Sequence, residues 1–295
     1  MKKILCICMS ATYQRTVVFE NLNLAKVNRA NHYNLYASGK AVNSARILAQ
    51  LEKDSVITVC PLPKNNSAEF IELAQKDGLG LCYVDTPGKI RDCWTLIDST
   101  AKTTTEIIAG EPVPQEDFSK CEIKLLKLIT QVLDECDGMI LAGSRQGKWS
   151  DDIYATICGI ALDKGKIVLA DFIEKELLST LKSAVPTIIK INEDEFKSTF
   201  NLPATQENIS QKSVELNNII VITRGTESTL AACRGKFFEC PVQKVEPLNT
   251  TACGDSFNAG FLYEYLKSGD MEKALQKGTW CATRNAVAEA PGTIR

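Results

Sequence analysis

Residues 247–269 have the sequence PLNTTACGDSFNAGFLYEYLKSG, in which small residues stand directly before an apolar segment. Apolar side chains at positions 257, 261, 262, 265 and 266 recur with helical spacing, and Gly269 ends the run. Residues 251–254 are therefore predicted to form a tight turn into a helix, whose first N–H groups suit an anion. Asp255 lies in the first helical turn, where it either only complements the helix dipole or takes part in chemistry. This stretch alone favours neither role.

Composition narrows the class of protein. The chain has 295 residues, a formal net charge of -2, twelve cysteines and one histidine, His32. The small net charge does not point to nucleic acid or an anionic membrane as a partner, and a single histidine without a C-x-x-C pair argues against a zinc site. The scattered cysteines are typical of small buried hydrophobes in a reducing compartment, and no apolar run approaches the roughly 20 residues that span a bilayer. We expect a cytoplasmic protein.

Apolar strands and amphipathic helices alternate over most of the chain. Such alternation predicts an α/β fold with a parallel sheet covered on both faces, and ligands gather at the carboxyl ends of its strands. The predicted strands are 3–9, 55–62, 138–143, 166–171, 187–192 and 218–225. The predicted helices are 41–51, 67–78, 122–137, 150–165, 175–184 and 193–200, followed by the one after Asp255.

Two segments break this rhythm. Residues 13–37 and 91–108 alternate apolar and polar side chains, which predicts half-exposed antiparallel strands. We interpret both as following a core strand, so we expect a small β-sheet lid over the strand ends. No dinucleotide fingerprint is present, and residues 143–150, GSRQGKWS, are one residue too short for a Walker-type phosphate loop.

Six segments, in order over nearly the whole chain, resemble the PfkB (ribokinase-like) carbohydrate kinases. They are ASGKAVNSARILAQL (37–51), LAGSRQGKW (141–149), IKINEDE (189–195), VITRG (221–225), GDSFNAGF (254–261) and EAPGTI (289–294). The resemblance implies one kinase domain over residues 1–295, with a ribokinase-like three-layer α/β/α core, a mostly parallel sheet and a small β-sheet lid.

Within the family, the chain is most similar to the 1-phosphofructokinase and tagatose-6-phosphate kinase branch. Residues 21–48, 89–98 (KIRDCWTLID) and 103–112 (TTTEIIAGEP) carry this likeness. It implies a phosphorylated sugar as substrate and a homodimer through the lid, whose apolar residues include Val17, Trp94 and Leu96. The substrate-binding residues that it implies are Gln14, Lys26, Arg29, Gly39, Lys40, Asn43, Arg91 and Ser144, with Lys26, Arg29 and Arg91 on the phosphate.

The same resemblance implies the chemistry of the opening stretch. Asp255 becomes the general base, and the N–H groups of Ala252, Cys253 and Gly254 form an anion hole for the transferring phosphoryl group. ATP and Mg²⁺ are the implied cofactors. Asn192 and Glu195 would orient water around Mg²⁺, although the same pair also suits a helix cap. The nucleotide-binding residues implied are Lys190, Asn192, Thr223, Gly225, Ala282, Asn285 and Gly292.

Several positions depart from the family pattern. Gln14 replaces an aspartate that grips sugar hydroxyls, Ser38 and Ala252 replace glycines, and Arg145 adds positive charge near the sugar. Ser38 is expected to narrow the sugar pocket. Three functions therefore remain open: an active phosphosugar kinase, a kinase for an unphosphorylated sugar or nucleoside, and a catalytically weak relative with a binding or regulatory role.

Overall fold

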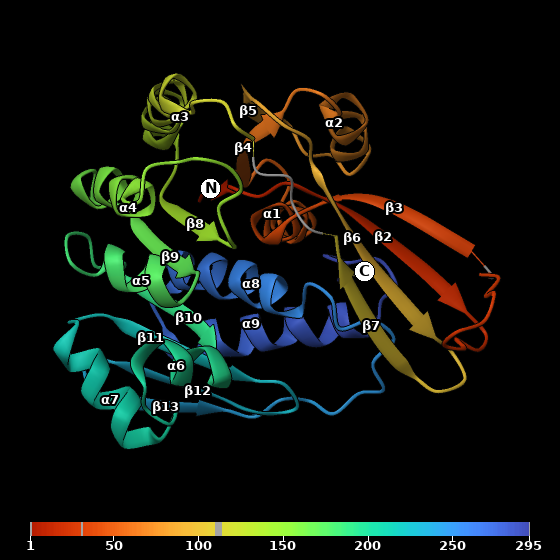
Figure 1. Cartoon of the computed structure of the whole chain (residues 1–295). Coiled ribbons are helices and arrows are strands. Elements are labelled where there is room, and N and C mark those ends of the chain that lie inside the picture. Colours follow the sequence, from red (N-terminus) through yellow and green to blue (C-terminus); the bar gives the residue numbers. More distant parts are fainter. Residues whose placement is uncertain (1, 31, 110–113, 295) are drawn as a thin grey trace.

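The main sheet has nine strands in the order β13-β12-β11-β10-β9-β8-β1-β4-β5 (Figure 1). The computed structural model describes residues 2–30, 32–109 and 114–294. The strands pair in parallel except that β12 runs opposite to β11 and β13. Their bounds are β1 (Ile4–Ile7), β4 (Val56–Pro63), β5 (Leu81–Thr86), β8 (Gly138–Ala142), β9 (Ile167–Asp171), β10 (Ile188–Asn192), β11 (Ile219–Arg224), β12 (Glu227–Cys233) and β13 (Lys236–Cys240).

Helices cover both faces of this sheet. Side chains pack on one face from α1 (Lys40–Leu51), α2 (Ser67–Lys76), α8 (Cys253–Ser268) and α9 (Met271–Ala286). The other face is covered by α3 (Ser119–Val132), α4 (Ile153–Asp163), α5 (Glu174–Thr180), α6 (Glu193–Phe200) and α7 (Gln206–Glu215), with a short 3-10 turn at Leu133–Glu135. Because the central strands are apolar except near their carboxyl ends, they can be buried on both sides. The predicted three-layer α/β/α core is confirmed.

The helix predicted after Asp255 is α8, and it lies deep in the molecule. Phe257 and Phe261 stack with ring centroids 5.8 Å apart and are buried. On the other side, a Cβ on Gly260 would lie 2.6 Å from Cys281 Sγ on α9, so the two helices pack too closely for a larger residue there. This packing holds the N-terminus of α8 rigidly at the edge of the sheet.

The predicted lid is a separate four-stranded sheet in the order β3-β2-β6-β7. Its strands are β2 (Thr12–Phe19), β3 (His32–Ser38), β6 (Arg91–Asp98) and β7 (Thr103–Ile108). The prediction of antiparallel strands is wrong for the central pair, because β2 and β6 run in parallel. Both follow strands of the parallel main sheet, β1 and β5, and so leave the same edge in the same direction. The prediction of half exposure is also wrong for β2, which is buried except at Arg15.

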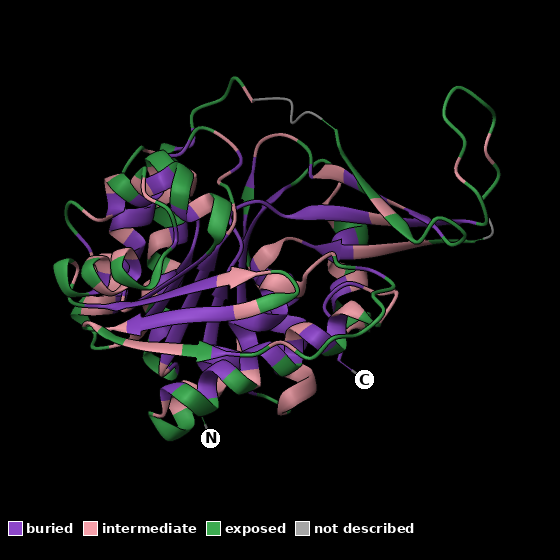
Figure 2. Ribbon diagram, turned by 90° about the horizontal axis from the view of Figure 1, so that it is seen from below, coloured by how far each residue is buried: buried purple, intermediate pink, exposed green. Residues whose placement is uncertain are grey.

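Figure 2 shows the lid projecting from the main body, with an exposed loop between β2 and β3 at its far end. Several elements went unpredicted: β5, α7, α9 and the β12–β13 hairpin. The hairpin turns at Arg234 and Gly235, both with positive φ (47° and 89°), a backbone geometry suited to two-residue hairpin turns.

All twelve cysteines are free thiols, and eight of them are buried, as predicted for small hydrophobes. In the described ranges, no helix combines the length and apolar character needed to cross a membrane.

Candidate active site

A cavity of about 690 Å³ lies where the carboxyl ends of the main-sheet strands meet the lid and α8. Strand ends, the lid, the start of α1, the turn before α8 and one side of α9 form its walls. The residues discussed below that line it are Thr12, Gln14, Ser38, Gly39, Lys40, Asn43, Arg91, Glu106, Asp171, Lys190, Asn192, Glu195, Thr223, Gly225, Thr251, Ala252, Cys253, Gly254, Asp255 and Ala282.

The turn before α8 has the predicted tight geometry. Ala252 adopts the left-handed conformation with φ 67°, and α8 begins at Cys253. The N–H of Cys253 already donates to the carbonyl of Thr250 at 3.2 Å, which closes the turn. A Cβ on Gly254 would lie 2.8 Å from Lys190 Nζ, so a side chain there would displace the lysine. Small residues are therefore required where the turn meets the cavity.

Asp255 lines this cavity although its residue is only 7% exposed. Its Oδ2 accepts a hydrogen bond from Asn43 Nδ2 at 2.8 Å. Burial raises the pKa of the Asp255 carboxyl to about 6, with a smaller contribution in the same direction from Asp171, while Lys40 and the Asn43 amide oppose the rise. A carboxylate with such a pKa can accept a proton near neutral pH.

The Asn43 amide has a fixed orientation. Its Oδ1 accepts hydrogen bonds from Ser38 Oγ at 2.9 Å and from Arg46 NH1 at 3.1 Å. Two donors on the oxygen leave the amide nitrogen to face Asp255. Ser38, one of the departures from the family pattern, thus lines the cavity and also helps to orient the partner of Asp255.

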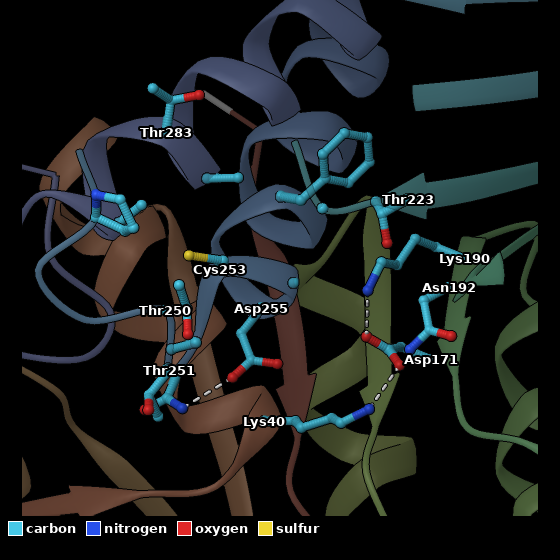
Figure 3. A pocket seen from close by; sticks show the side chains of 18 of the residues that line it. Lys40, Asp171, Lys190, Asn192, Thr223, Thr250, Thr251, Cys253, Asp255 and Thr283 are labelled. Atoms are coloured by element: carbon cyan, nitrogen blue, oxygen red, sulfur yellow. Dashed lines mark hydrogen bonds and ion pairs between the residues drawn. The ribbon is translucent and has the colours of Figure 1, made fainter. Parts of the chain in front are cut away.

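Asp171, at the end of β9, is the main charged residue that the sequence analysis missed. Lys40 Nζ lies 2.9 Å from its Oδ1, and Lys190 Nζ lies 3.1 Å from its Oδ2 (Figure 3). Asn258 also donates to Oδ2, at 2.6 Å. Burial alone would raise the pKa of Asp171, but Lys190, Lys40 and the Asn258 amide outweigh burial and hold it well below the ordinary value. A signal was available, because the predicted strand 166–171 ends in this aspartate at the edge where ligands bind.

Asn192 and Glu195 form a reciprocal capping box at the start of α6. Asn192 Oδ1 accepts from the Glu195 N–H at 2.8 Å, and Glu195 Oε2 accepts from the Asn192 N–H at 2.7 Å. Both residues also line the cavity. Within the described residues no group of three or more His, Cys, Asp and Glu could hold a metal directly. An amide and a carboxylate oxygen suit a magnesium ion that keeps most of its water ligands.

Three of the nucleotide-binding residues implied by the resemblance line the cavity beside Lys190 and Asn192: Thr223, Gly225 and Ala282. Asn285 and Gly292 lie behind its wall. Asn285 Nδ2 donates to the carbonyl of Thr251 at 2.8 Å, and Asn285 Oδ1 accepts from the Gly292 N–H at 2.7 Å. Asn285 therefore braces the turn before α8 against the C-terminal segment.

The residues that the resemblance implies for sugar binding divide into those that line the cavity and those that lie outside it. Gln14, Gly39, Lys40, Asn43 and Arg91 line the cavity. Gln14 Nε2 donates to Thr95 Oγ1 at 2.7 Å on the lid. A Cβ on Gly39, which has φ 123°, would lie 2.5 Å from Cys8 Sγ, so glycine is required there. Residues 110–112 of the lid segment that resembles the family lie outside the described residues.

The expected convergence of cations is not found within one subunit. Lys26 and Arg29 are exposed in the loop between β2 and β3, at the far end of the lid (Figure 2). Ser144 is exposed in the loop that follows β8. Arg145 donates to the carbonyls of Trp149 and Ser150 at 3.0 and 2.8 Å, and its guanidinium also pairs with Asp151 at 2.8 Å, because its own loop folds around it.

Residues 1–294 match the family described as pfkB family carbohydrate kinase. The chain is 25% identical to a tagatose-6-phosphate kinase of Staphylococcus epidermidis, over 99% of this chain and 94% of that protein. It is 24% identical to a 1-phosphofructokinase of Vibrio cholerae, over 94% and 87% of the two chains.

Solved structures share the fold. Phosphofructokinase-2 from Escherichia coli superposes with a TM-score of 0.84 at 14% identity, covering 99% of this chain and 94% of that one. Ribokinase from Thermotoga maritima superposes with a TM-score of 0.74 at 19% identity, covering 99% and 95%. These likenesses show a ribokinase-like α/β fold. The chain belongs to the PfkB carbohydrate kinase family, whose members are ATP-dependent phosphotransferases acting on an alcohol group.

Proposed function

We propose that the protein transfers the γ-phosphoryl group of ATP to a hydroxyl of a phosphorylated sugar, of the fructose-1-phosphate, fructose-6-phosphate or tagatose-6-phosphate type. The observation that carries this proposal is the buried carboxylate of Asp255 at the N-terminus of α8, held by Asn43 and facing a cavity that also contains Lys40, Arg91 and Lys190. A base and several cations around one cavity suit the transfer of an anionic group to a hydroxyl.

In this mechanism Asp255 accepts the proton of the sugar hydroxyl as its oxygen attacks the γ-phosphorus. The bond between the γ-phosphorus and the bridging oxygen breaks, and ADP leaves. The N–H groups of Ala252 and Gly254 would face the charge that develops on the transferring group, and the α8 dipole would add to their effect. The N–H of Cys253, the third member of the implied anion hole, is engaged with the carbonyl of Thr250 and would have to give up that bond to take part. Lys190 lies beside Gly254 and Asp171, where its ammonium group can contact the phosphates of ATP.

The cavity also fits the implied cofactors. Thr223, Gly225 and Ala282 line the cavity and would border the nucleotide, and Asn192 and Glu195 would orient the water around Mg²⁺. The metal would neutralise charge on the phosphates of ATP. The lid, which we assign to the same kinase domain of residues 1–295, would close the sugar side through Gln14 and Arg91.

Arg91 supports a phosphorylated substrate. It opens β6, donates to Thr12 Oγ1 at 2.9 Å and lines the cavity. Both named relatives reported above act on sugar phosphates by their names. The Arg91→Ala variant is expected to raise KM for the phosphosugar by roughly 10- to 100-fold, because a charge-assisted contact to phosphate is lost. Its KM for ATP should change little, since Thr223, Gly225 and Ala282 lie on other elements.

Steady-state kinetics with a panel of phosphorylated and free sugars, ATP and magnesium tests the proposal. Turnover of a phosphosugar in preference to its free counterpart supports it. A preference for the free sugar, or an unchanged phosphosugar KM in Arg91→Ala, would favour the kinase for an unphosphorylated sugar or nucleoside. Absence of turnover across the panel would favour the catalytically weak, regulatory relative. Gln14, which lacks the charge of aspartate, is the residue that keeps this third function open.

We also propose a homodimer through the outer face of the lid. This face exposes Tyr33 (46%), Trp94 (36%) and Ile107 (49%), and β3 and β7 are free edge strands of the described sheet. The loop that carries Lys26 and Arg29 lies far from the cavity of its own subunit. A second subunit packed across the lid would bring this loop to the cavity of its partner.

Light scattering at micromolar concentration should therefore give twice the chain mass of 32.4 kDa. Trp94→Lys should shift the protein towards the monomer, because it places a charge in an apolar contact. A wild-type protein that runs as a monomer would contradict the proposed dimer.

A further inference from the structure

A chain of hydrogen bonds joins the lid to the turn before α8. Gln14 Nε2 donates to Thr95 Oγ1 at 2.7 Å, Thr95 Oγ1 lies 3.3 Å from Thr251 Oγ1, and Thr251 Oγ1 donates to Glu106 Oε1 at 2.9 Å. Glu106 stands on β7, and its strand register places it opposite Thr95 on β6. Three strands of the lid thus contribute to a single network, of which Gln14, Glu106 and Thr251 line the cavity.

The network has one consistent direction. Because the Thr251 hydroxyl gives its hydrogen to the carboxylate of Glu106, its oxygen is free to accept the hydrogen of Thr95. The oxygen of Thr95 in turn accepts from Gln14. Every donor then has an acceptor, and the chain ends on an ionised group, which makes the last bond the strongest. Removing Glu106 would leave the direction of the two hydroxyls undetermined.

Thr251 is the point where this network reaches the site of chemistry. It directly precedes Ala252, the first residue of the proposed anion hole, and it lines the same cavity as Asp255 (both are labelled in Figure 3). Its backbone is held from the main body, because its N–H donates to Asn249 Oδ1 at 2.9 Å and its carbonyl accepts from Asn285 at 2.8 Å. Its side chain reaches the lid, where it contacts Thr95 and Glu106.

Glu106 has no role in the mechanism above, and its charge is unfavourable near phosphate groups. We propose that Glu106 is a positioning residue. It ties the Thr251 hydroxyl, and through it the turn at residues 252–254, to the lid, so that the turn takes its productive position when the lid is closed over the sugar. This inference rests on the proposed kinase function and adds a link between the sugar side and the phosphate side of the cavity.

The lid offers a matched control. Lys102, at the β6–β7 turn, pairs with Glu246 at 2.9 Å, and the two side chains are 68% and 89% exposed. This pair also joins the lid to the segment before α8, but it lies in solvent, where ion pairs contribute little. A general loosening of the lid would respond to both contacts, whereas the proposed role belongs to Glu106 alone.

The test compares Glu106→Ala, Glu106→Gln, Thr251→Val and Lys102→Ala in steady-state kinetics on the sugar that the wild type turns over. Glu106→Ala and Thr251→Val should each lower kcat by about 10-fold, with KM for ATP within about twofold, because the lost bond ends on a charged group. Glu106→Gln should recover most of this loss, since its amide oxygen can still accept from Thr251. Lys102→Ala should match the wild type.

A double-mutant cycle completes the test. Glu106→Ala combined with Thr251→Val should lower kcat no further than either change alone, because both remove the same bond. The same cycle measured on the free energy of unfolding should also show coupling, and this readout does not depend on which substrate is used. The proposal would be overturned if the fold-losses in kcat of the two single variants multiplied in the double variant and their effects on the free energy of unfolding simply added. So would a Glu106→Gln variant as slow as Glu106→Ala, since the charge itself would then matter.

Discussion

Asp255→Asn is expected to lower kcat by about 100-fold or more, since general-base catalysis typically contributes factors of 10² to 10⁴. The substitution keeps the size of the side chain and its place in the first turn of α8, but an amide cannot take the proton of the sugar hydroxyl. ATP binding should change little. Steady-state kinetics at saturating substrates and ATP binding by calorimetry measure the two effects. Glu264→Gln on the same helix is the control and should retain the wild-type rate.

The pH dependence of the wild type provides a second measurement. Because burial raises the pKa of Asp255 to about 6, the base is protonated below this pH and ionised above it. The rate should fall on the acid side with a midpoint near pH 6, against about 4 for an ordinary aspartate. A rate that stays level down to pH 5, or an Asp255→Asn enzyme within tenfold of the wild type, would falsify the assignment of Asp255 as the base.

The stability of Asp255→Asn should show whether its low rate comes from the missing base or from a damaged fold. The folded-state pKa of Asp255 is raised, so the native protein binds this proton more tightly than the unfolded chain does. The ionised side chain therefore destabilises the fold, an effect that develops as the pH rises from about 4 to 6 and persists above. At pH 7–8 Asp255→Asn should be more stable than the wild type, by up to about 3 kcal/mol on this linkage. Urea unfolding measures this difference.

Asp171→Asn is expected to produce the largest loss of stability. Lys190 is only 5% exposed and pairs with Asp171, whose side chain is 1% exposed, so removal of the carboxylate leaves a buried charge without its partner. Breaking such a buried pair typically costs about 3–5 kcal/mol. Lys40 is 41% exposed and can turn towards water, so most of the loss should come from Lys190. Urea unfolding at pH 7 without nucleotide measures it.

The sign of the pH dependence is opposite to that of Asp255. The folded-state pKa of Asp171 is depressed, so its stabilising contribution is fully present above the unfolded pKa of about 4 and is lost as the pH falls further. The gap in stability between the wild type and Asp171→Asn should therefore narrow below pH 4. Glu215→Gln is the control, because Glu215 pairs with Lys212 at 2.6 Å while itself 57% exposed, and it should barely change stability. Equal stability of the wild type and Asp171→Asn at pH 7 would contradict the buried-pair interpretation.

Local sequence pattern was sufficient for most of the core. The spacing of apolar residues within a strand or a helix depends on neighbours only a few positions away. The bounds of β1, β9, α1 and α8 are therefore close to the predicted ones. The hairpin of β12 and β13 and the helix α9 were missed, although the Arg234-Gly235 turn was a usable signal for the hairpin. The resemblance to the family added Lys40, Asn43, Lys190, Asn192 and Asp255, and the cavity includes all five.

The features that the sequence pattern could not predict depend on strand order and on contacts between residues far apart in the chain. Asp171 meets Lys40 across 131 positions, and Thr251 meets Glu106 across 145, so neither pair leaves a local period in the sequence. The parallel pairing of β2 with β6 follows from the common edge at which two core strands end, and it decides which lid side chains face the cavity. Lys26 and Arg29 are placed on the phosphate only by the family resemblance. The length and direction of β2 carry them beyond the cavity of their own subunit, so their proposed role depends on a second subunit.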